Sequence, residues 1–273
     1  MNRYFCHLTG LCLLAQTALL GSALAEDFII VQSTTSTQNS GLYDALLPEF
    51  KEMSGIEVRV VAVGTGQAIK NATNCDGDVL LVHAKSSEEK FVADGYGLTR
   101  SDVMYNDFVI VGPASDPAGI AGRNDIALAL QKIAETKAAF ASRGDDSGTH
   151  KKELSLWNSA GIDGPAASGS WYRETGSGMG ATLNVGIGMD AYVMTDRATW
   201  IAFGNKGNHT IVVEGDPAMF NQYGIVDISP DRCPNVKTDL ADQFIDWILS
   251  SNGQDAIAAY QRDGQQLFFP NAK

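Results

Sequence analysis

The chain alternates between short apolar runs and segments with helical periodicity, and this alternation limits the fold more than any other feature. Strands separated by helices at such spacing form βαβ units and a parallel sheet. The runs expected as strands are 28–31, 58–63, 78–82, 107–111, 138–142, 191–194, 210–213 and 225–228. The segments expected as helices are 42–53, 67–72, 86–92, 126–136, 149–159, a stretch after Gly180, and an amphipathic pair within 239–260. The sequence therefore predicts an α/β protein.

Two residues predict local geometry in the first of these helices. Gly55 follows it at the position of a C-cap, where glycine readily adopts the left-handed conformation. Pro48 lies inside it, so we expect a kink or a new start there.

The order of the segments predicts two lobes, one inserted into the other. The sequence contains no internal repeat, low-complexity tract or flexible linker. Without a linker, the second lobe has to be an insertion, and the C-terminal helices have to return to the first lobe. We expect residues 26–106 and 233–273 to form lobe 1 and residues 107–232 to form lobe 2.

The N-terminus predicts export. Arg3 precedes a largely apolar stretch at 8–20, and Ala23-Leu24-Ala25 has the small-x-small form that signal peptidase cuts. We expect residues 1–25 to be a signal peptide and the remainder to be periplasmic. A membrane anchor is the alternative, but polar residues interrupt the apolar stretch, which is shorter than the about 20 residues that a spanning helix needs.

Cleavage would leave 248 of the 273 residues and change the net charge from −12 to −13, because the removed segment carries one arginine and no acid. An acidic chain argues against nucleic acid as a partner. It also repels small anions, so an anion site has to be built from local donors. Two cysteines would remain, Cys75 and Cys233, and an oxidising compartment allows either a disulfide or two free thiols.

Three loops at strand-to-helix junctions carry polar donors. The loop 33–37 holds five consecutive hydroxyl residues, and the loop 64–67 reads Gly-Thr-Gly-Gln. Hydroxyls and backbone N–H groups at a helix start lie at the positive end of the helix dipole, which suits an anion. Each of these two loops is also compatible with an ordinary solvated turn that caps a helix.

The third loop, 142–149, adds a permanent positive charge. Arg143 lies a few residues before the Ser-Gly-Thr sequence at 147–149. Its guanidinium offers forked donors to an oxyanion, and Asp145 can hold it in one rotamer. The alternative is a surface Arg143–Asp145 pair with Ser147 as a simple N-cap.

The first loop contains no carboxylate that would accept a proton from the ligand. A fully ionised dianion offers no proton and would be repelled by such a group, whereas hydrogen phosphate carries a proton to be recognised. The residues therefore favour sulfate, molybdate or tungstate over phosphate and leave the choice among these three open.

The segment 33–42, Ser-Thr-Thr-Ser-Thr-Gln-Asn-Ser-Gly-Leu, resembles the Thr-Thr-Thr-Ser-Thr-Gln-x-Ser-Gly-Leu signature of the tungstate ABC-transporter substrate-binding (TupA-like) family. Ser33 stands where the family's first threonine usually stands, so the hydroxyl is kept and a methyl group is lost. The resemblance continues in order over essentially the whole chain after residue 25. It is also carried by 63–68, 78–84, 103–108, 142–145, 147–150, 176–180, 195–197, 214–216 and 252–254.

This resemblance implies a type II periplasmic-binding-protein fold, with the ligand in a cleft between two lobes. It implies a monomer that captures tungstate, with molybdate as a further ligand, and delivers it to an ABC-transporter permease with its ATPase. It implies no cofactor and no metal cation, because the metal arrives within the oxyanion. Tyr105 and Tyr192 are expected either to line the cleft or to pack in the core. The ligand contacts that the resemblance assigns are Ser33, Thr34, Thr35, Ser36, Thr65, Gly66, Arg143, Ser147, Gly148, Thr149 and Ser177.

Other functions remain open from the sequence. A binding protein of this kind can prefer molybdate or sulfate, and an oxyanion sensor would bind the same ligand but contact a membrane receptor. A serine hydrolase would use Ser147 with His150 and with Asp145 or Asp146. No Gly-x-Ser-x-Gly elbow is present, however, and the histidines show no metal-ligand spacing.

Overall fold

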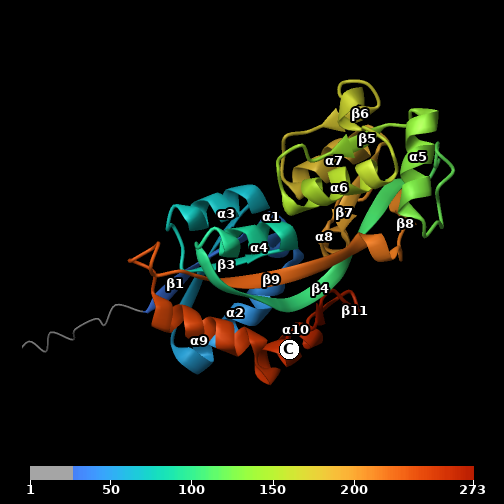
Figure 1. Ribbon diagram of the computed structural model, residues 1–273. Helices are drawn as coiled ribbons and strands as arrows, with labels where there is room; N and C mark the ends of the chain where they lie inside the picture. The colour runs from blue at the N-terminus through green and yellow to red at the C-terminus, as the bar shows by residue number, and fades with distance from the viewer. Residues whose placement is uncertain (1–26) are drawn as a thin grey trace, which may run out of the picture.

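The computed structural model describes residues 27–273, so the expected signal peptide at 1–25 lies outside the described residues. The chain forms two α/β lobes joined by the long strands β4 (Gly97–Pro113) and β9 (Phe220–Ile228) (Figure 1). Before β4, the elements are β1 (Phe28–Thr34), α1 (Thr35–Ser40), α2 (Leu42–Ser54), β2 (Glu57–Val63), α3 (Thr65–Thr73), β3 (Val79–Val82) and α4 (Lys85–Ala93). Between β4 and β9 lie α5 (Ile126–Thr136), β5 (Phe140–Ser142), α6 (Gly148–Ser159), β6 (Tyr172–Glu174), α7 (Met179–Gly188), β7 (Tyr192–Asp196), α8 (Arg197–Ala202), β8 (His209–Val213) and the short 3-10 helices Pro165–Ala167 and Pro217–Met219. After β9 come α9 (Thr238–Leu249), α10 (Ser251–Ala259), β10 (Gln261–Arg262), β11 (Gln265–Gln266) and β12 (Phe269–Pro270).

One mixed sheet runs through both lobes in the order β2-β1-β3-β9-β4-β7-β5-β6, with β8 and β12 also paired to β4. β1 is parallel to β2 and β3, and β5 is parallel to β6 and β7, as the alternation of strands and helices predicts. β4 and β9 are antiparallel to their neighbours. The prediction of parallel strands is therefore confirmed within each lobe and misses the two strands that join the lobes.

β4 belongs to both lobes because its 17 residues pair with different strands along their length. Residues 97–107 pair with β9, whereas residues 108–113 pair with β7 and β8. β9 in turn pairs with β3 of the first lobe through 224–227. The expected boundary at 106/107 thus falls within β4, and we propose that lobe 2 ends near Phe220 instead of at residue 232.

Each lobe has its own apolar core. In the first, Phe50 of α2 packs against Phe244 and Trp247 of α9, with ring centroids 5.2 and 5.3 Å apart. In the second, Phe140 of β5 packs against Trp157 of α6 at 5.2 Å. Separate cores allow the lobes to move as units about the strands that join them.

The local predictions for the first and last helices have mixed outcomes. Gly55 caps α2 with a φ of 77°, and its N–H donates to the Lys51 carbonyl, so the predicted C-cap is confirmed. α2 runs through Pro48 as one helix, so no new start occurs there. The amphipathic pair forms α9 and α10, which return to the first lobe and contact its strands and α2.

Cys75, after α3, and Cys233, after β9, form a disulfide with their Cα atoms 5.2 Å apart. The bridge settles the alternative that the sequence left open. It ties the turn before β3 to the segment that leads into α9. Within residues 27–273, the structure contains no helix with the length and apolarity needed to cross a membrane.

Candidate functional site

Hydrogen bonds between the lobes connect the first residues of helices from both lobes. The N–H of Gly148, at the start of α6, donates to Thr65 Oγ1, at the start of α3, at 2.9 Å. Arg143 Nη1 donates to Ser36 Oγ of α1 at 3.4 Å, and Thr199 Oγ1 of α8 lies 3.4 Å from the Ser36 carbonyl oxygen. Helix N-termini carry partial positive charge and unpaired N–H groups, so this place suits an anion. We call it the junction site, comprising Thr35, Ser36, Thr65, Gly66, Arg143, Gly148 and Thr149.

Arg143 supplies a permanent positive charge to the junction site, although it is only 2% exposed. Its Nε and Nη2 both donate to Asp145 Oδ2, at 3.1 and 2.6 Å. The other carboxylate oxygen of Asp145 accepts from the Ser147 N–H at 3.2 Å. Asp145 therefore fixes the guanidinium on one side and leaves Nη1 directed across the junction toward Ser36. A planar guanidinium held in this way is preorganised to bind an oxyanion.

Two threonine hydroxyls from opposite lobes have no hydrogen-bond partner. Thr35 Oγ1 on α1 and Thr149 Oγ1 on α6 are both buried, and neither finds a partner within the described residues 27–273. Thr35 Oγ1 lies 3.8 Å from the point where a Cβ on Gly178, the N-cap of α7, would stand. A buried hydroxyl without a partner costs about 1–3 kcal/mol of stability. These two hydroxyls are available to donate to the oxygen atoms of a ligand.

Glycines allow the two lobes to approach each other closely. A Cβ on Gly148 would lie 2.9 Å from Thr65 Oγ1 and 3.2 Å from the His83 carbonyl oxygen. A Cβ on Gly66 would overlap the carboxylate of Asp146. Since side chains are not tolerated at such distances, larger residues at either position would hold the lobes apart.

Comparison with known proteins identifies the family. Residues 20–252 match the PBP superfamily domain. The tungstate-binding protein TupA of Peptoclostridium acidaminophilum is 49% identical over 252 residues, which cover 91% of this chain and 87% of that protein. The chain belongs to the TupA family of the PBP superfamily.

Two solved structures support the same assignment. A tungstate ABC transporter structure from Geobacter sulfurreducens is 49% identical in sequence and superposes with a TM-score of 0.79. The match covers 87% of this chain and 100% of that chain. The tungstate-binding protein TupA from Desulfovibrio alaskensis G20 is also 49% identical, with a TM-score of 0.76, and is matched over 90% and 100%. The expected two-lobed periplasmic-binding-protein fold is therefore confirmed for this member of the TupA family.

Within this TupA-family fold, two of the predicted contact residues use their hydroxyls inside the first lobe. Ser33 and Thr34 are the last residues of β1, where a loop was expected. Ser33 Oγ donates to the Leu81 carbonyl at 2.7 Å and also hydrogen-bonds to Tyr43 Oη. Thr34 caps α1 by accepting from the Thr37 N–H at 3.3 Å. The Ser33 hydroxyl is thus committed to Leu81 and Tyr43, and the Thr34 hydroxyl caps α1.

Ser147 and Ser177 support the segment around Arg143. Ser147 is the N-cap of α6, and its Oγ accepts from the His150 N–H at 3.2 Å. Ser177 Oγ donates to the Thr175 carbonyl at 3.1 Å, and its N–H donates to the Arg143 carbonyl at 3.2 Å. The structure therefore brings both residues close to the junction site. The Ser177 hydroxyl donates within its own loop, whereas the Ser147 hydroxyl accepts a hydrogen bond and keeps its own proton to donate.

The two tyrosines considered from the sequence pack against other parts of the protein. Tyr105 stacks with Phe220 and Phe269, with ring centroids 5.0 and 5.3 Å away. Tyr192 Oη donates to Asp116 Oδ1 at 2.6 Å in the second lobe. Of the alternatives left open for these tyrosines, packing is the one that the structure shows.

Sequence reasoning did not select three buried polar residues beside the junction site, Asp196, Thr199 and His83. Asp196 caps α8 by accepting from the Thr199 N–H and Oγ1, at 2.9 and 2.6 Å, and burial raises its pKa. His83 hydrogen-bonds through Nδ1 to Asn221 Oδ1 at 3.1 Å, and burial lowers its pKa to about 4, so it is neutral at pH 7. Asp196 and His83 both lie within segments that carry the family resemblance, and this position could have identified them as candidates for the site.

The geometry does not provide Ser147 with a general base. His150 Nδ1 accepts from the Asp146 N–H at 3.1 Å, and Asp145 is bound to Arg143. A serine nucleophile needs a base within hydrogen-bond reach that a third group orients. Within residues 27–273, no group of three or more His, Cys, Asp or Glu side chains is arranged to hold a metal ion.

Proposed function

We propose that this protein captures tungstate or molybdate at the junction site and delivers it to an ABC-transporter permease with its ATPase. One observation carries the proposal. Thr35 and Thr149, on helices of opposite lobes, bury hydroxyls without partners in the same junction where Arg143 is held by Asp145. A tetrahedral oxyanion would satisfy donors from both lobes at once and would therefore favour their closure.

The chemistry of the junction site supports a fully ionised oxyanion. The carboxylates of Asp145 and Asp196 already accept hydrogen bonds from Arg143 and Thr199, so we expect neither to serve as the acceptor for a proton of the ligand. Hydrogen phosphate would bring a proton that lacks an acceptor here. The relatives named for tungstate support tungstate over sulfate as the ligand.

We further propose that the protein acts outside the cytoplasm as a monomeric, non-catalytic carrier, after removal of residues 1–25. The Cys75–Cys233 disulfide supports this location, because disulfides persist in oxidising compartments such as the periplasm. Of the contacts assigned from the sequence, we propose that Thr35, Ser36, Thr65, Arg143, Gly148 and Thr149 meet the ligand or hold the lobes around it. Ser33, Thr34, Gly66, Ser147 and Ser177 then shape the site.

The proposal predicts a ligand-dependent rise in melting temperature. A ligand at about 100 times its Kd adds about 2.7 kcal/mol to the free energy of unfolding, which raises the Tm of a chain of this size by about 5–10 °C. We expect this rise with tungstate and molybdate, and little change with phosphate, in thermal scans at matched ionic strength. An equal rise with phosphate, or no rise with either metal oxyanion, would contradict the proposal.

A further inference from the structure

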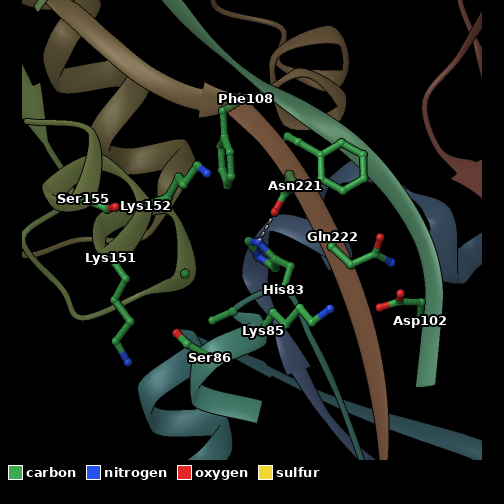
Figure 2. Close-up of a pocket in the computed structure, with 13 residues that line it drawn as sticks. His83, Lys85, Ser86, Asp102, Phe108, Lys151, Lys152, Ser155, Asn221 and Gln222 are labelled. Atoms are coloured by element: carbon green, nitrogen blue, oxygen red, sulfur yellow. Dashed lines mark hydrogen bonds between the residues drawn. The ribbon is translucent and has the colours of Figure 1, made fainter. Parts of the chain in front are cut away.

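A cavity of about 570 Å³ opens between the lobes beside the junction site (Figure 2). It touches the junction site only through Gly148, and its walls come from both lobes and from β9. Ligand sites for small molecules have volumes of about 300–1,000 Å³. The cavity is thus large enough for an organic molecule and much larger than a tetrahedral oxyanion requires.

Three lysines line this space, which we call the lysine cavity: Lys85 of the first lobe and Lys151 and Lys152 of the second. Asp102 is the one carboxylate among the lining residues, and it is paired with Arg100. Arg100 also pairs with Glu88, so Asp102 is only partly neutralised, but the lining residues still carry more positive than negative charge, although the chain carries a net charge of −12. A concave positive site in an acidic protein concentrates anions locally.

Lys152 is the lysine whose positive charge is least compensated by a neighbouring carboxylate. It is half-buried, and it forms no ion pair or hydrogen bond with any residue that the structure describes. Burial lowers its pKa, and the Asp216 carboxylate counteracts this effect without contacting it. By comparison, Lys85 and Lys151 pair with Glu89 and Asp146 at 3.9 and 3.4 Å, in exposed contacts that contribute little.

The side chains are directed in a way that fits a bridging guest. Figure 2 shows Lys152 extending toward Phe108 on one side and Lys85 extending toward Asp102 and Gln222 on the other, whereas Lys151 points away from both. Phe108 and Phe220 add apolar surface to the cavity. Apolar walls with a few charged groups are typical of sites for organic ligands.

We propose that the lysine cavity binds a small organic polyanion, one with two or more carboxylate or phosphate groups, that bridges Lys85 of one lobe and Lys152 of the other. Because the two lysines belong to different lobes, the guest contacts both only when the lobes are closed. Binding of the polyanion and closure of the junction site therefore favour each other, and the coupling is reciprocal. This is a second site, and it does not depend on which oxyanion the junction site prefers.

The test is a calorimetric titration, in which tricarballylate is added to protein that is saturated with tungstate. Tricarballylate has three carboxylates and lacks the hydroxyl group through which related acids chelate metal oxyanions. A second arm uses propane-1,3-diol bisphosphate, which also lacks a free hydroxyl group and separates carboxylate from phosphate recognition. We expect one of the two to bind with 1:1 stoichiometry, and Lys152→Gln to weaken that binding by about tenfold or more, through the loss of one charge-assisted contact.

Lys132→Gln is the matched control, because Lys132 is a second-lobe lysine on α5 that pairs with Glu135 away from the cavity. It removes the same charge and is expected to change polyanion binding by less than about twofold. Tungstate binding of Lys152→Gln without polyanion is measured separately and should stay within about threefold of the unaltered protein. Absence of binding in both arms, or equal effects of the two substitutions, would overturn the second site. Neither result would affect the assignment of the junction site.

Discussion

Replacing Arg143 with alanine is expected to weaken tungstate binding by about 100-fold or more, equivalent to about 3 kcal/mol. The substitution removes a guanidinium that is 2% exposed and is fixed by two hydrogen bonds to Asp145. It also leaves the Asp145 carboxylate without its partner, so an uncompensated negative charge would remain where a dianion has to bind. Both effects act in the same direction.

Calorimetric titration of tungstate into the folded variant measures this loss. Arg173→Ala is the matched control, since Arg173 is an exposed arginine on β6 of the same lobe, and it should bind as the unaltered protein does. Arg143→Lys should recover only part of the affinity, because an ammonium group carries the charge but not the planar fork. An Arg143→Ala affinity within threefold of the unaltered protein would refute the role assigned to this residue.

Removing the disulfide with Cys75→Ala and Cys233→Ala is expected to lower the free energy of unfolding by about 2–4 kcal/mol. The bridge joins residues 158 positions apart, so it restricts a long loop in the unfolded chain. It also connects the turn before β3 with the segment before α9, and Cys233 is fully buried among apolar side chains of the first lobe.

Denaturant unfolding of the oxidised and reduced protein measures this difference. The double variant provides the control, because a reducing agent should lower the unfolding midpoint of the unaltered protein and leave that of the variant unchanged. A reduced protein that unfolds at the same midpoint as the oxidised one would show that the bridge contributes nothing to stability.

The alternation of strands and helices was readable from the sequence because periodicity reports which face of each element is buried. Periodicity does not report which strands become neighbours or in which direction they run. The first half of β4, from 97 to 106, is mostly polar and partly exposed, so it was not recognised as a strand. The antiparallel pairing of β4 with β9, which joins the lobes, was missed for this reason.

The three donor loops were predicted, and the structure brings them together at one junction. Which hydroxyls remain free could not be predicted, because that depends on side-chain direction after folding. β1 continues through Thr34, so Ser33 is turned toward Tyr43 while Thr35 begins a helix. Asp196 and Thr199 were missed because they belong to a fourth strand-to-helix junction, at the end of β7, whose sequence has neither glycines nor a run of hydroxyls.

The central claim is that Thr35, Thr149 and Arg143 hold one oxyanion between the lobes. Anomalous diffraction at a tungsten absorption edge, from crystals grown with tungstate, tests it most directly. The account predicts a single strong peak between the lobes, for a tungsten atom whose oxygen atoms lie within hydrogen-bond distance of Thr35 Oγ1, Thr149 Oγ1 and the Arg143 guanidinium. A strongest peak in the lysine cavity or on the outer surface, with these three groups unoccupied, would contradict it.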